Sequence, residues 1–255
     1  MLASTFISLT WPASVTRGWP FLFADGFVSW LYGDDTYGKD VMLKVLVAGI
    51  VGLGLLASPS VAGDLSGTFR LTAGKFDFKS ISQNYDFDDI TISGRVVLKD
   101  SYFVSLEHSK LKHSSLNRNH TIKPYWTKVG YQFSLGNDQE NDLLSKIKFS
   151  ASLGYYTYKT LYAGEFPDND TSGTSYSIGA TFSPSEQFDF SAAFTPIKYN
   201  SGGAINGKRQ RTTDLAATYY FSEKIGWTVT YRYVDSRWLG SADADGWSTG
   251  IVWKF

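Results

Sequence analysis

Cysteine is absent from the sequence, and histidine is scarce, with three residues among 255. The lack of cysteine excludes a disulfide scaffold, a thiolate metal site, a cysteine nucleophile and a lipoprotein anchor. Three histidines leave little room for a histidine metal cluster, so we expect neither a metal nor a cofactor. No charge sign dominates, because 24 basic residues balance 24 acidic ones. This balance, without a basic block, lacks the cationic footprint of a nucleic-acid binder.

The abundant residues favour strands. Aromatic residues make up 16% of the chain, and its 24 glycines accompany many serines and threonines. Aromatic and β-branched residues are enriched in strands, whereas glycine is frequent in turns. The composition therefore predicts an all-β protein, with a length that suits one large domain or two small ones.

Residues 42–62 have the three parts of a secretory signal peptide. There is a short positive start at 42–44, an apolar run at 45–57 and a small-x-Ala end at 60–62. The apolar run is too short for a membrane-spanning helix, which needs about 20 residues. Its three glycines disfavour the alternative of a buried core helix. We therefore expect export, with cleavage after Ala62.

Residues 1–41 precede this signal and show no sustained hydrophobic period. Because a signal peptide stands at the N-terminus, we hypothesise that translation starts at Met42 and that residues 1–41 are upstream sequence. The alternative is a genuine N-terminal extension. In either case residues 63–255 are expected to form the exported domain.

From Ser66 onward, apolar and polar residues alternate in segment after segment. A period of two places successive side chains on opposite faces of a strand. The pattern predicts ten strands, near residues 67–78, 89–98, 102–111, 125–135, 147–156, 175–182, 188–195, 213–221, 227–233 and 247–255. Eight strands is the alternative if the first and third segments are misassigned.

Two of these segments are irregular. In the first, Phe69 and Leu71 share one parity, whereas Phe76 and Phe78 have the other. A β-bulge at Gly74-Lys75 would explain the change of phase. In the third, the consecutive apolar residues at 102–104 leave the direction of the faces open.

The predicted connections alternate in length, which indicates an up-and-down antiparallel sheet. Shorter connections lie at one end, at 99–101, 136–145, 184–187 and 222–226. Long polar connections lie at the other end, at 79–88, 112–120, 159–173, 200–210 and 236–245.

Strand length and the two strand faces favour a membrane barrel. The segments exceed the usual length of about 5–6 residues in globular sheets and approach the roughly 9–11 residues that a tilted strand needs to cross a bilayer. One face is apolar with aromatics at the strand ends, and the other carries Ser, Thr, Gly and a few charges. Because lipid does not tolerate an open sheet edge, we expect a closed transmembrane β-barrel. The alternative is a lipocalin-type barrel, with a polar exterior and an apolar lumen.

The chain ends on Trp253-Lys254-Phe255, in phase with Ile251 and Trp247. With the signal peptide and the alternating connections, this ending resembles small Gram-negative outer-membrane β-barrel proteins of the porin-like superfamily. The resemblance covers residues 63–255 and does not select a subfamily. It implies an outer-membrane location among outer-membrane lipid and lipopolysaccharide. It also implies that Trp253 and Phe255 form the signal read by the outer-membrane barrel assembly machinery.

Eight charged residues fall on the polar face and are expected to line the lumen: Arg70, Arg95, Glu107, Lys128, Lys148, Asp189, Asp214 and Arg232. One interpretation is that they pair and fill the interior, because buried charges persist when they are paired. The other is a narrow pore that slightly favours anions.

Three further groups have candidate roles. His113 and Ser115 resemble the His and Ser of lipid A deacylases, but position 116 is Leu where that family has Asn, and solvated loop residues are the alternative. Asp88 and Asp89 resemble rim acids of the omptin proteases, whose additional Asp-x-His is absent. Cations could contact lipopolysaccharide phosphates or form a solvated loop, and the candidates are Lys208, Arg209 and Arg211.

These features give three hypotheses of function. The first, which the sequence favours, is a non-enzymatic porin-like channel for passive passage of small solutes. The second is a closed structural or surface-interaction barrel, whose loops bind lipopolysaccharide or host surfaces. The third is a lipid A-modifying enzyme. Oligomeric state is not encoded in any pattern that we recognise.

Overall fold

A computed structural model describes residues 65–79, 84–115, 118–135, 143–162, 169–201, 207–236 and 242–255. The expected signal peptide at 42–62 and the expected upstream extension at 1–41 lie outside these residues. In the described ranges, no helix is long and apolar enough to cross a membrane. Their regular secondary structure is β-strand throughout.

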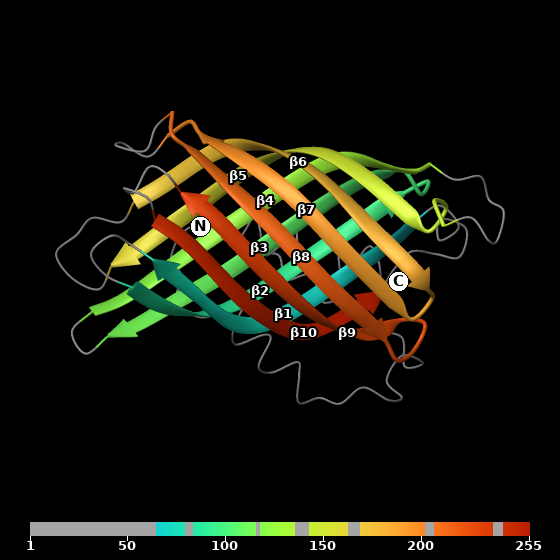
Figure 1. Cartoon of the computed structure of the whole chain (residues 1–255). Coiled ribbons are helices and arrows are strands. Elements are labelled where there is room, and N and C mark those ends of the chain that lie inside the picture. The colour runs from blue at the N-terminus through green and yellow to red at the C-terminus, as the bar shows by residue number, and fades with distance from the viewer. Residues whose placement is uncertain are drawn as a thin grey trace, which may run out of the picture. The chain divides into compact units, whose positions relative to one another are not determined.

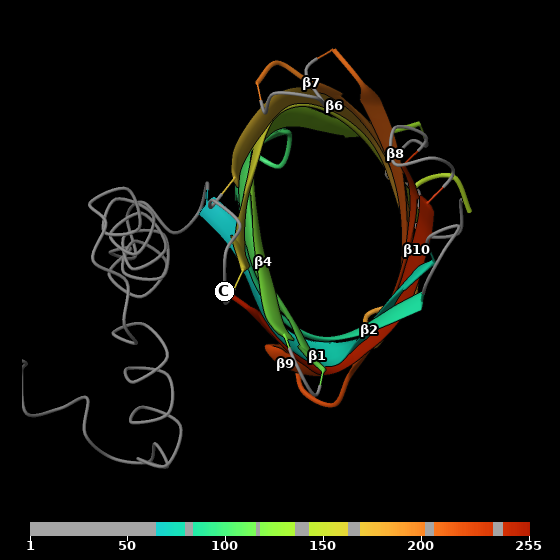
Figure 2. The same ribbon diagram turned by 90° about the vertical axis from the view of Figure 1, so that its left-hand side faces the viewer.

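The strands form one closed barrel. They are β1 (Leu65–Lys79), β2 (Asn84–Leu98), β3 (Tyr102–Ser115), β4 (Arg118–Ser134), β5 (Ile147–Tyr162), β6 (Asn169–Ser185), β7 (Phe188–Tyr199), β8 (Arg209–Tyr220), β9 (Ile225–Ser236) and β10 (Ala242–Lys254). Each strand pairs antiparallel with its neighbours in sequence (Figure 1), and β1 pairs with β10 to close the ring seen in Figure 2. The predicted ten-stranded up-and-down barrel is confirmed, and the eight-stranded alternative is wrong.

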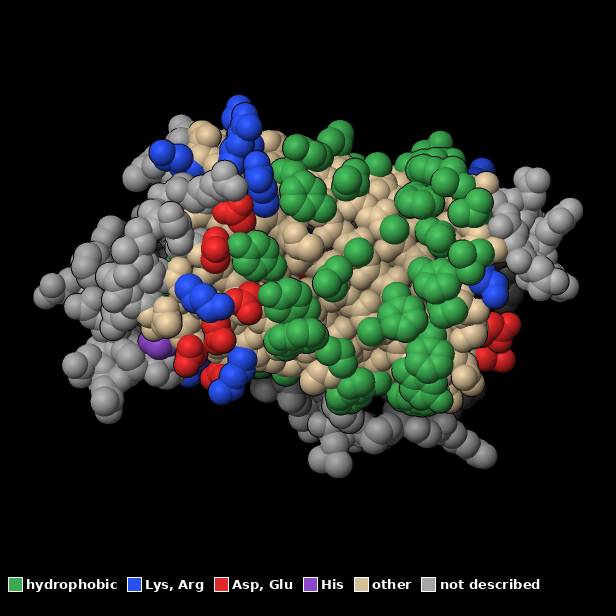
Figure 3. Space-filling model, in the orientation of Figure 1, with side chains coloured by type: hydrophobic (Ala, Val, Ile, Leu, Met, Phe, Trp, Pro, Cys, Tyr) green, Lys and Arg blue, Asp and Glu red, His purple; other side chains and the backbone are tan. Residues whose placement is uncertain are grey.

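Large apolar side chains cover the outer wall. Leu153, Ile178 and Trp247 each keep more than half of their surface exposed, whereas Ser152 and Ser177 beside them are buried. Figure 3 shows hydrophobic side chains over a broad band, with charged residues gathered toward one end. An apolar exterior contradicts the lipocalin-type alternative and has the form that a bilayer-spanning barrel requires.

The two faces of the third predicted strand are assigned by the same contrast between an exposed apolar outer wall and a buried inner wall. Tyr102 and Val104 are exposed on the outer wall, whereas Phe103 is buried beneath the Arg95 guanidinium, 3.7 Å from its ring centroid. A tight hairpin precedes it, in which Lys99 and Asp100 adopt positive φ angles of 50° and 57°. This left-handed backbone reverses the chain sharply, so that Leu98 pairs with Tyr102.

The β-bulge predicted at Gly74-Lys75 is wrong. The ladders of β1 with β2 and with β10 run through these residues without a shift of register. Lys75, Asp77 and Lys79 are instead exposed, and the intervening Phe76 and Phe78 are half-buried. The polarity of the two faces reverses here because this part of the wall lies beyond the apolar band. A register irregularity does occur between Phe182 and Ser185.

The strands also reach further than expected into the predicted long connections. β2 begins at Asn84, β3 continues to Ser115 and β4 begins at Arg118. The expected connections at 79–88 and 112–120 therefore consist largely of paired strand. Their outward polar residues resemble loop sequence, although the backbone remains in the ladder.

The seam between β1 and β10 depends on close backbone approach. A Cβ atom built at Gly250 would lie 1.9 Å from the carbonyl oxygen of Leu71, and one at Gly74 would lie 2.0 Å from that of Trp247. The last residue extends the seam, because Phe255 and Gly67 exchange backbone hydrogen bonds of 3.0 and 3.1 Å. The C-terminal segment thus closes the barrel directly.

Candidate functional site

Arg232 on β9 is the centre of a charge cluster inside the barrel. Its Nη1 lies 2.7 Å from Glu107 Oε1 on β3, and its Nε lies 2.5 Å from Asp214 Oδ1 on β8. Asp214 is the register partner of Arg232 on the neighbouring strand. Strand β3, in contrast, is separated from β9 by β2, β1 and β10 in one direction and by five strands in the other. The ion pair between Arg232 and Glu107 therefore crosses the interior.

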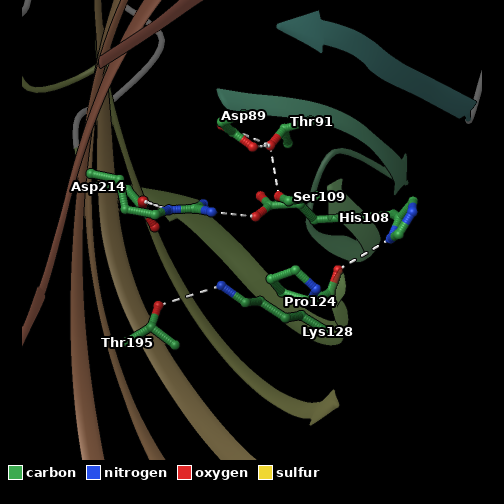
Figure 4. Close-up of polar contacts among 10 residues, drawn as sticks. Asp89, Thr91, His108, Ser109, Pro124, Lys128, Thr195 and Asp214 are labelled. Carbon is green, nitrogen blue, oxygen red and sulfur yellow. Dashed lines mark hydrogen bonds and ion pairs between the residues drawn. The ribbon is translucent and has the colours of Figure 1, made fainter. Parts of the chain in front are cut away.

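Lys128 makes a second crossing contact. Its Nζ on β4 donates to Thr195 Oγ1 on β7 at 3.4 Å, and Figure 4 shows the two side chains extending toward each other. Strands β5 and β6 lie between them in the wall. Thr195 is itself fully buried and exchanges a 2.8 Å hydrogen bond with Ser177. The amine is thus joined to a fixed hydroxyl network.

Two more contacts between non-adjacent strands lie nearer the short turns. Arg95 Nη2 on β2 donates to Gln132 Oε1 on β4 at 2.6 Å, and the Gln132 amide donates to the Asp100 carbonyl at 2.9 Å. Lys254 Nζ on β10 lies 3.4 Å from Asp189 Oδ2 on β7. Polar contacts therefore link non-adjacent strands near the short turns as well as around Arg232.

Small polar residues of the inner wall are packed rather than hydrated. Thr195, Thr212 and Thr228 keep at most 1% of their surface accessible. The Thr218 hydroxyl donates to Thr228 at 3.0 Å, and a 2.6 Å hydrogen bond joins Thr91 and Ser109, as Figure 4 shows. A wall residue that faced a wide aqueous channel would keep accessible surface. Neighbouring side chains of the inner wall therefore cover these positions.

An aromatic cluster lies on the inner wall toward the long connections. It consists of Trp126, Tyr156, Ile197 and Tyr199, with Tyr158 packed against it. The rings of Trp126 and Tyr156 are 4.5 Å apart between centroids, and the Tyr199 hydroxyl donates to the Gln210 side chain. The cluster adjoins the charged residues, because Trp126 stands opposite Glu107 in the ladder and its ring lies 4.6 Å from Lys128 Nζ.

The charged side chains of the Arg232 cluster are paired with one another but are not completely buried. The side chains of Arg232, Glu107 and Asp214 keep 24%, 24% and 22% of their surface accessible. Some water therefore reaches the cluster, while the surrounding wall weakens screening of the pairs. Without Arg232, Glu107 and Asp214 would lose the cation that they share, and an unpaired carboxylate is costly inside a protein.

The structure places the predicted lumen residues as follows. Six take part in contacts between strands, namely Arg95, Glu107, Lys128, Asp189, Asp214 and Arg232. Arg70 is half-buried and interacts electrostatically with Glu107, Asp214 and Asp189. Lys148 is exposed near the short-turn start of β5.

Sequence reasoning missed several partners in this network. Gln132 and Thr195 are uncharged, so a search for lumen charges did not select them. Lys254 has the parity of the inner face and could have been found from phase alone. Asp89 was assigned to a loop rim, whereas its carboxylate accepts a 3.0 Å hydrogen bond from Thr91 on the inner wall (Figure 4).

The candidate enzymatic residues do not assemble into a catalytic group in the described part of the chain. His113 Nδ1 lies 2.7 Å from the Asp86 carbonyl oxygen, and its ring contacts Tyr85 and Phe87. The side chain of Ser115 lies outside the description. Among the described residues, no cluster of three or more His, Cys, Asp or Glu could hold a metal ion.

The predicted basic residues lie on the outside, at the end with the long connections. Lys208, Arg209 and Arg211 are all exposed, and Lys198 of β7 is exposed beside them. At the opposite end, Trp253 and Phe255 lie in the closing seam. Lys198 was not selected from the sequence because it belongs to a different segment.

Comparison with known proteins gives similar solved structures but no family. Neither a protein-family model nor a curated protein matches the chain. Similar solved structures include the NanC porin, at 9% identity and a TM-score of 0.43, covering 72% of this chain and 100% of that one. Ail, the attachment invasion locus protein of Yersinia pestis, has 12% identity and a TM-score of 0.40, with coverages of 75% and 99%. The outer membrane protease OmpT from Escherichia coli has 8% identity and a TM-score of 0.40, with coverages of 75% and 97%. The likeness is one of barrel architecture alone.

Proposed function

We propose that this chain is an outer-membrane β-barrel that is closed to solutes and acts as a structural or surface-interaction protein, without enzymatic chemistry. The observation that carries the proposal is the ion pair between Arg232 and Glu107, which spans the interior between strands on nearly opposite sides. The sequence pattern favours a passive channel, whereas the contacts across the interior favour the closed barrel.

The energetics of the interior support this proposal. A permeating solute would have to separate Arg232 from Glu107 and Lys128 from Thr195, and it would have to replace those interactions. Breaking a well-paired buried ion pair costs roughly 3–5 kcal/mol, somewhat less where water already has access. Barrels with few strands have interiors near the size that side chains fill, so water offers little compensation.

The outer wall supports the proposed location. Exposed apolar residues such as Leu153, Ile178 and Trp247 would be unfavourable in water and favourable in lipid. The charged end would then lie beyond the bilayer, on the side of the long connections. The resemblance of the sequence to Gram-negative outer-membrane barrels favours that membrane over others.

A liposome-swelling assay tests the proposal. Protein expressed from the full sequence is purified, reconstituted into liposomes and diluted into an isotonic solution of a small sugar such as arabinose. A heat-modifiable gel shift first establishes that the barrel is folded. We expect swelling at the rate of protein-free liposomes. Rapid swelling that depends on the amount of folded protein would contradict a closed interior.

One observation favours a second candidate, a narrow and intermittently open ion path. Arg232, Glu107 and Asp214 retain about a quarter of their side-chain surface, so the cluster is not enclosed on every side, although Glu107 Oε1 itself is buried. In this case the folded protein would exclude sugars but show brief ionic conductance. Excess basic residues among the lumen charges would make that conductance slightly anion-selective.

A further inference from the structure

A group of exposed cations occupies the outer wall where β7 and β8 meet the long-connection end. This basic patch consists of Lys198, Lys208, Arg209 and Arg211, each of which is exposed. Lys198 stands directly opposite Arg209 in the ladder, and Arg211 stands opposite Pro196 one step along the same outer face. Figure 3 shows blue side chains gathered at this end of the molecule. The fold therefore joins cations from two strands that the sequence separates.

The basic patch has more positive than negative charge, whereas other cations at this end of the barrel face acidic residues. Like charges directly opposite each other destabilise a pair of strands. Elsewhere, Lys75 stands opposite Asp88 and Lys79 forms a 2.7 Å ion pair with Asp245. Beside the four cations of the basic patch, Asp235 stands opposite Arg211, and Asp243 stands opposite Asp235 on the next strand. The described ion pairs involve other cations, so the patch retains excess positive charge.

The position of the patch along the barrel axis indicates which layer of the membrane surrounds it. Phe194 and Leu215 are exposed, and each lies four residues along its strand from a cation of the patch, Lys198 on β7 and Arg211 on β8. Four strand residues cover about 13 Å along the strand, or roughly 10 Å along the axis of a tilted barrel. Tyr176, also exposed, lies on neighbouring β6, two residues from the partner of Lys198. The patch thus lies just beyond the apolar band, at the level of aromatic girdles and headgroups.

We infer that the basic patch binds the phosphate groups of a phosphorylated glycolipid of the lipopolysaccharide type in the surrounding leaflet. Arginine presents a planar fork of donors that matches phosphate geometry, and lysine adds charge. The apolar residues beneath the patch would contact the acyl chains of the same molecule. This continuity with the apolar band favours a lipid over a soluble polyanion. The inference rests on the proposed function, because that function places the barrel in a membrane.

Native mass spectrometry in a phosphate-free detergent tests this inference. Protein from the full sequence is purified in dodecyl maltoside and titrated with diphosphoryl lipid A. The variant Lys198→Gln/Arg209→Gln should bind diphosphoryl lipid A at least roughly tenfold more weakly than the wild type, because two charge-assisted contacts are lost. The matched control, Lys75→Gln/Lys79→Gln, removes two cations from the same end where acids already face them, and it should bind like the wild type.

Several results would overturn the inference. Equal binding of dephosphorylated lipid A would show that the apolar wall alone holds the lipid. Equal weakening in the two double variants would show a general charge effect, and binding of a heparin oligosaccharide without lipid A would identify a different partner. A gel shift establishes folding, and the single variant Arg209→Gln repeats the test if the double variant does not fold. Sugar-permeable liposomes would refute the closed interior while leaving this lipid site intact.

Discussion

Arg232 compensates two interior carboxylates with one side chain. A guanidinium has five N–H donors in a rigid plane, so it can bond Glu107 and Asp214 simultaneously. A lysine would supply the charge without the fork. Because one of the two carboxylates belongs to the nearly opposite wall, this single residue ties together parts of the barrel that the backbone ladder connects only indirectly.

The first prediction concerns the stability of this cluster. Replacing Arg232 by Met should lower the free energy of unfolding by roughly 2–4 kcal/mol, because Glu107 and Asp214 would lose their shared cation. Urea unfolding followed by tryptophan fluorescence and gel shift measures the change. Arg232→Lys should fall between the wild type and Arg232→Met.

A compensating variant separates the charge effect from loss of packing. In Glu107→Gln/Asp214→Asn/Arg232→Met, neither carboxylate is left without its cation, Arg70 keeps its interaction with Asp189, and most of the stability should return. If this triple variant is as unstable as Arg232→Met alone, the cluster is not held by its charges and the assignment is wrong.

Among the elements, the seam between β1 and β10 is the most demanding, because it joins the two ends of the barrel. The strands approach closely at Gly74 and Gly250, and Phe255 adds the last backbone pair to Gly67. A side chain at Gly250 would meet the backbone of β1 rather than a movable group. Closure therefore depends on residues with no polar or charged chemistry of their own.

The second prediction tests this seam. Gly250→Val should lower the free energy of unfolding by about 3 kcal/mol or more, since overpacking against backbone forces the strands apart. The fraction of gel-shifted protein after refolding measures closure. The neighbouring variant Ile251→Val, in an exposed outward side chain, should refold like the wild type. Equal refolding of both variants would contradict the close approach.

The sequence predicts the elements well because a period of two is a local property. Tyr102 and Phe103 could not be assigned to faces from the pattern, since both are apolar and only closure decides which one faces lipid. The pattern predicts connections at the start of β2, the end of β3 and the start of β4, because polar residues dominate the sequence there beyond the apolar band. The pairing of Arg232 with Glu107 was equally out of reach, because it depends on the barrel circumference and not on sequence spacing.

The whole molecule combines an apolar outer band, a charged end and an interior crossed by side chains. The band fits lipid, and the charged end carries the basic patch of Lys198, Lys208, Arg209 and Arg211. The interior contacts of Arg232, Lys128, Arg95 and Lys254 link non-adjacent strands. These three features together support the proposal of a barrel whose surface, rather than its lumen, is available to partners.

Single-channel recording in a planar bilayer tests the closed interior most directly. Folded wild-type protein should give no discrete conductance steps. The triple variant Glu107→Ala/Asp214→Ala/Arg232→Ala removes the crossing side chains together, so that neither carboxylate remains without its cation, and it should give steps. Ohmic steps from the wild type, with conductance unchanged in the triple variant, would contradict closure by the Arg232 cluster.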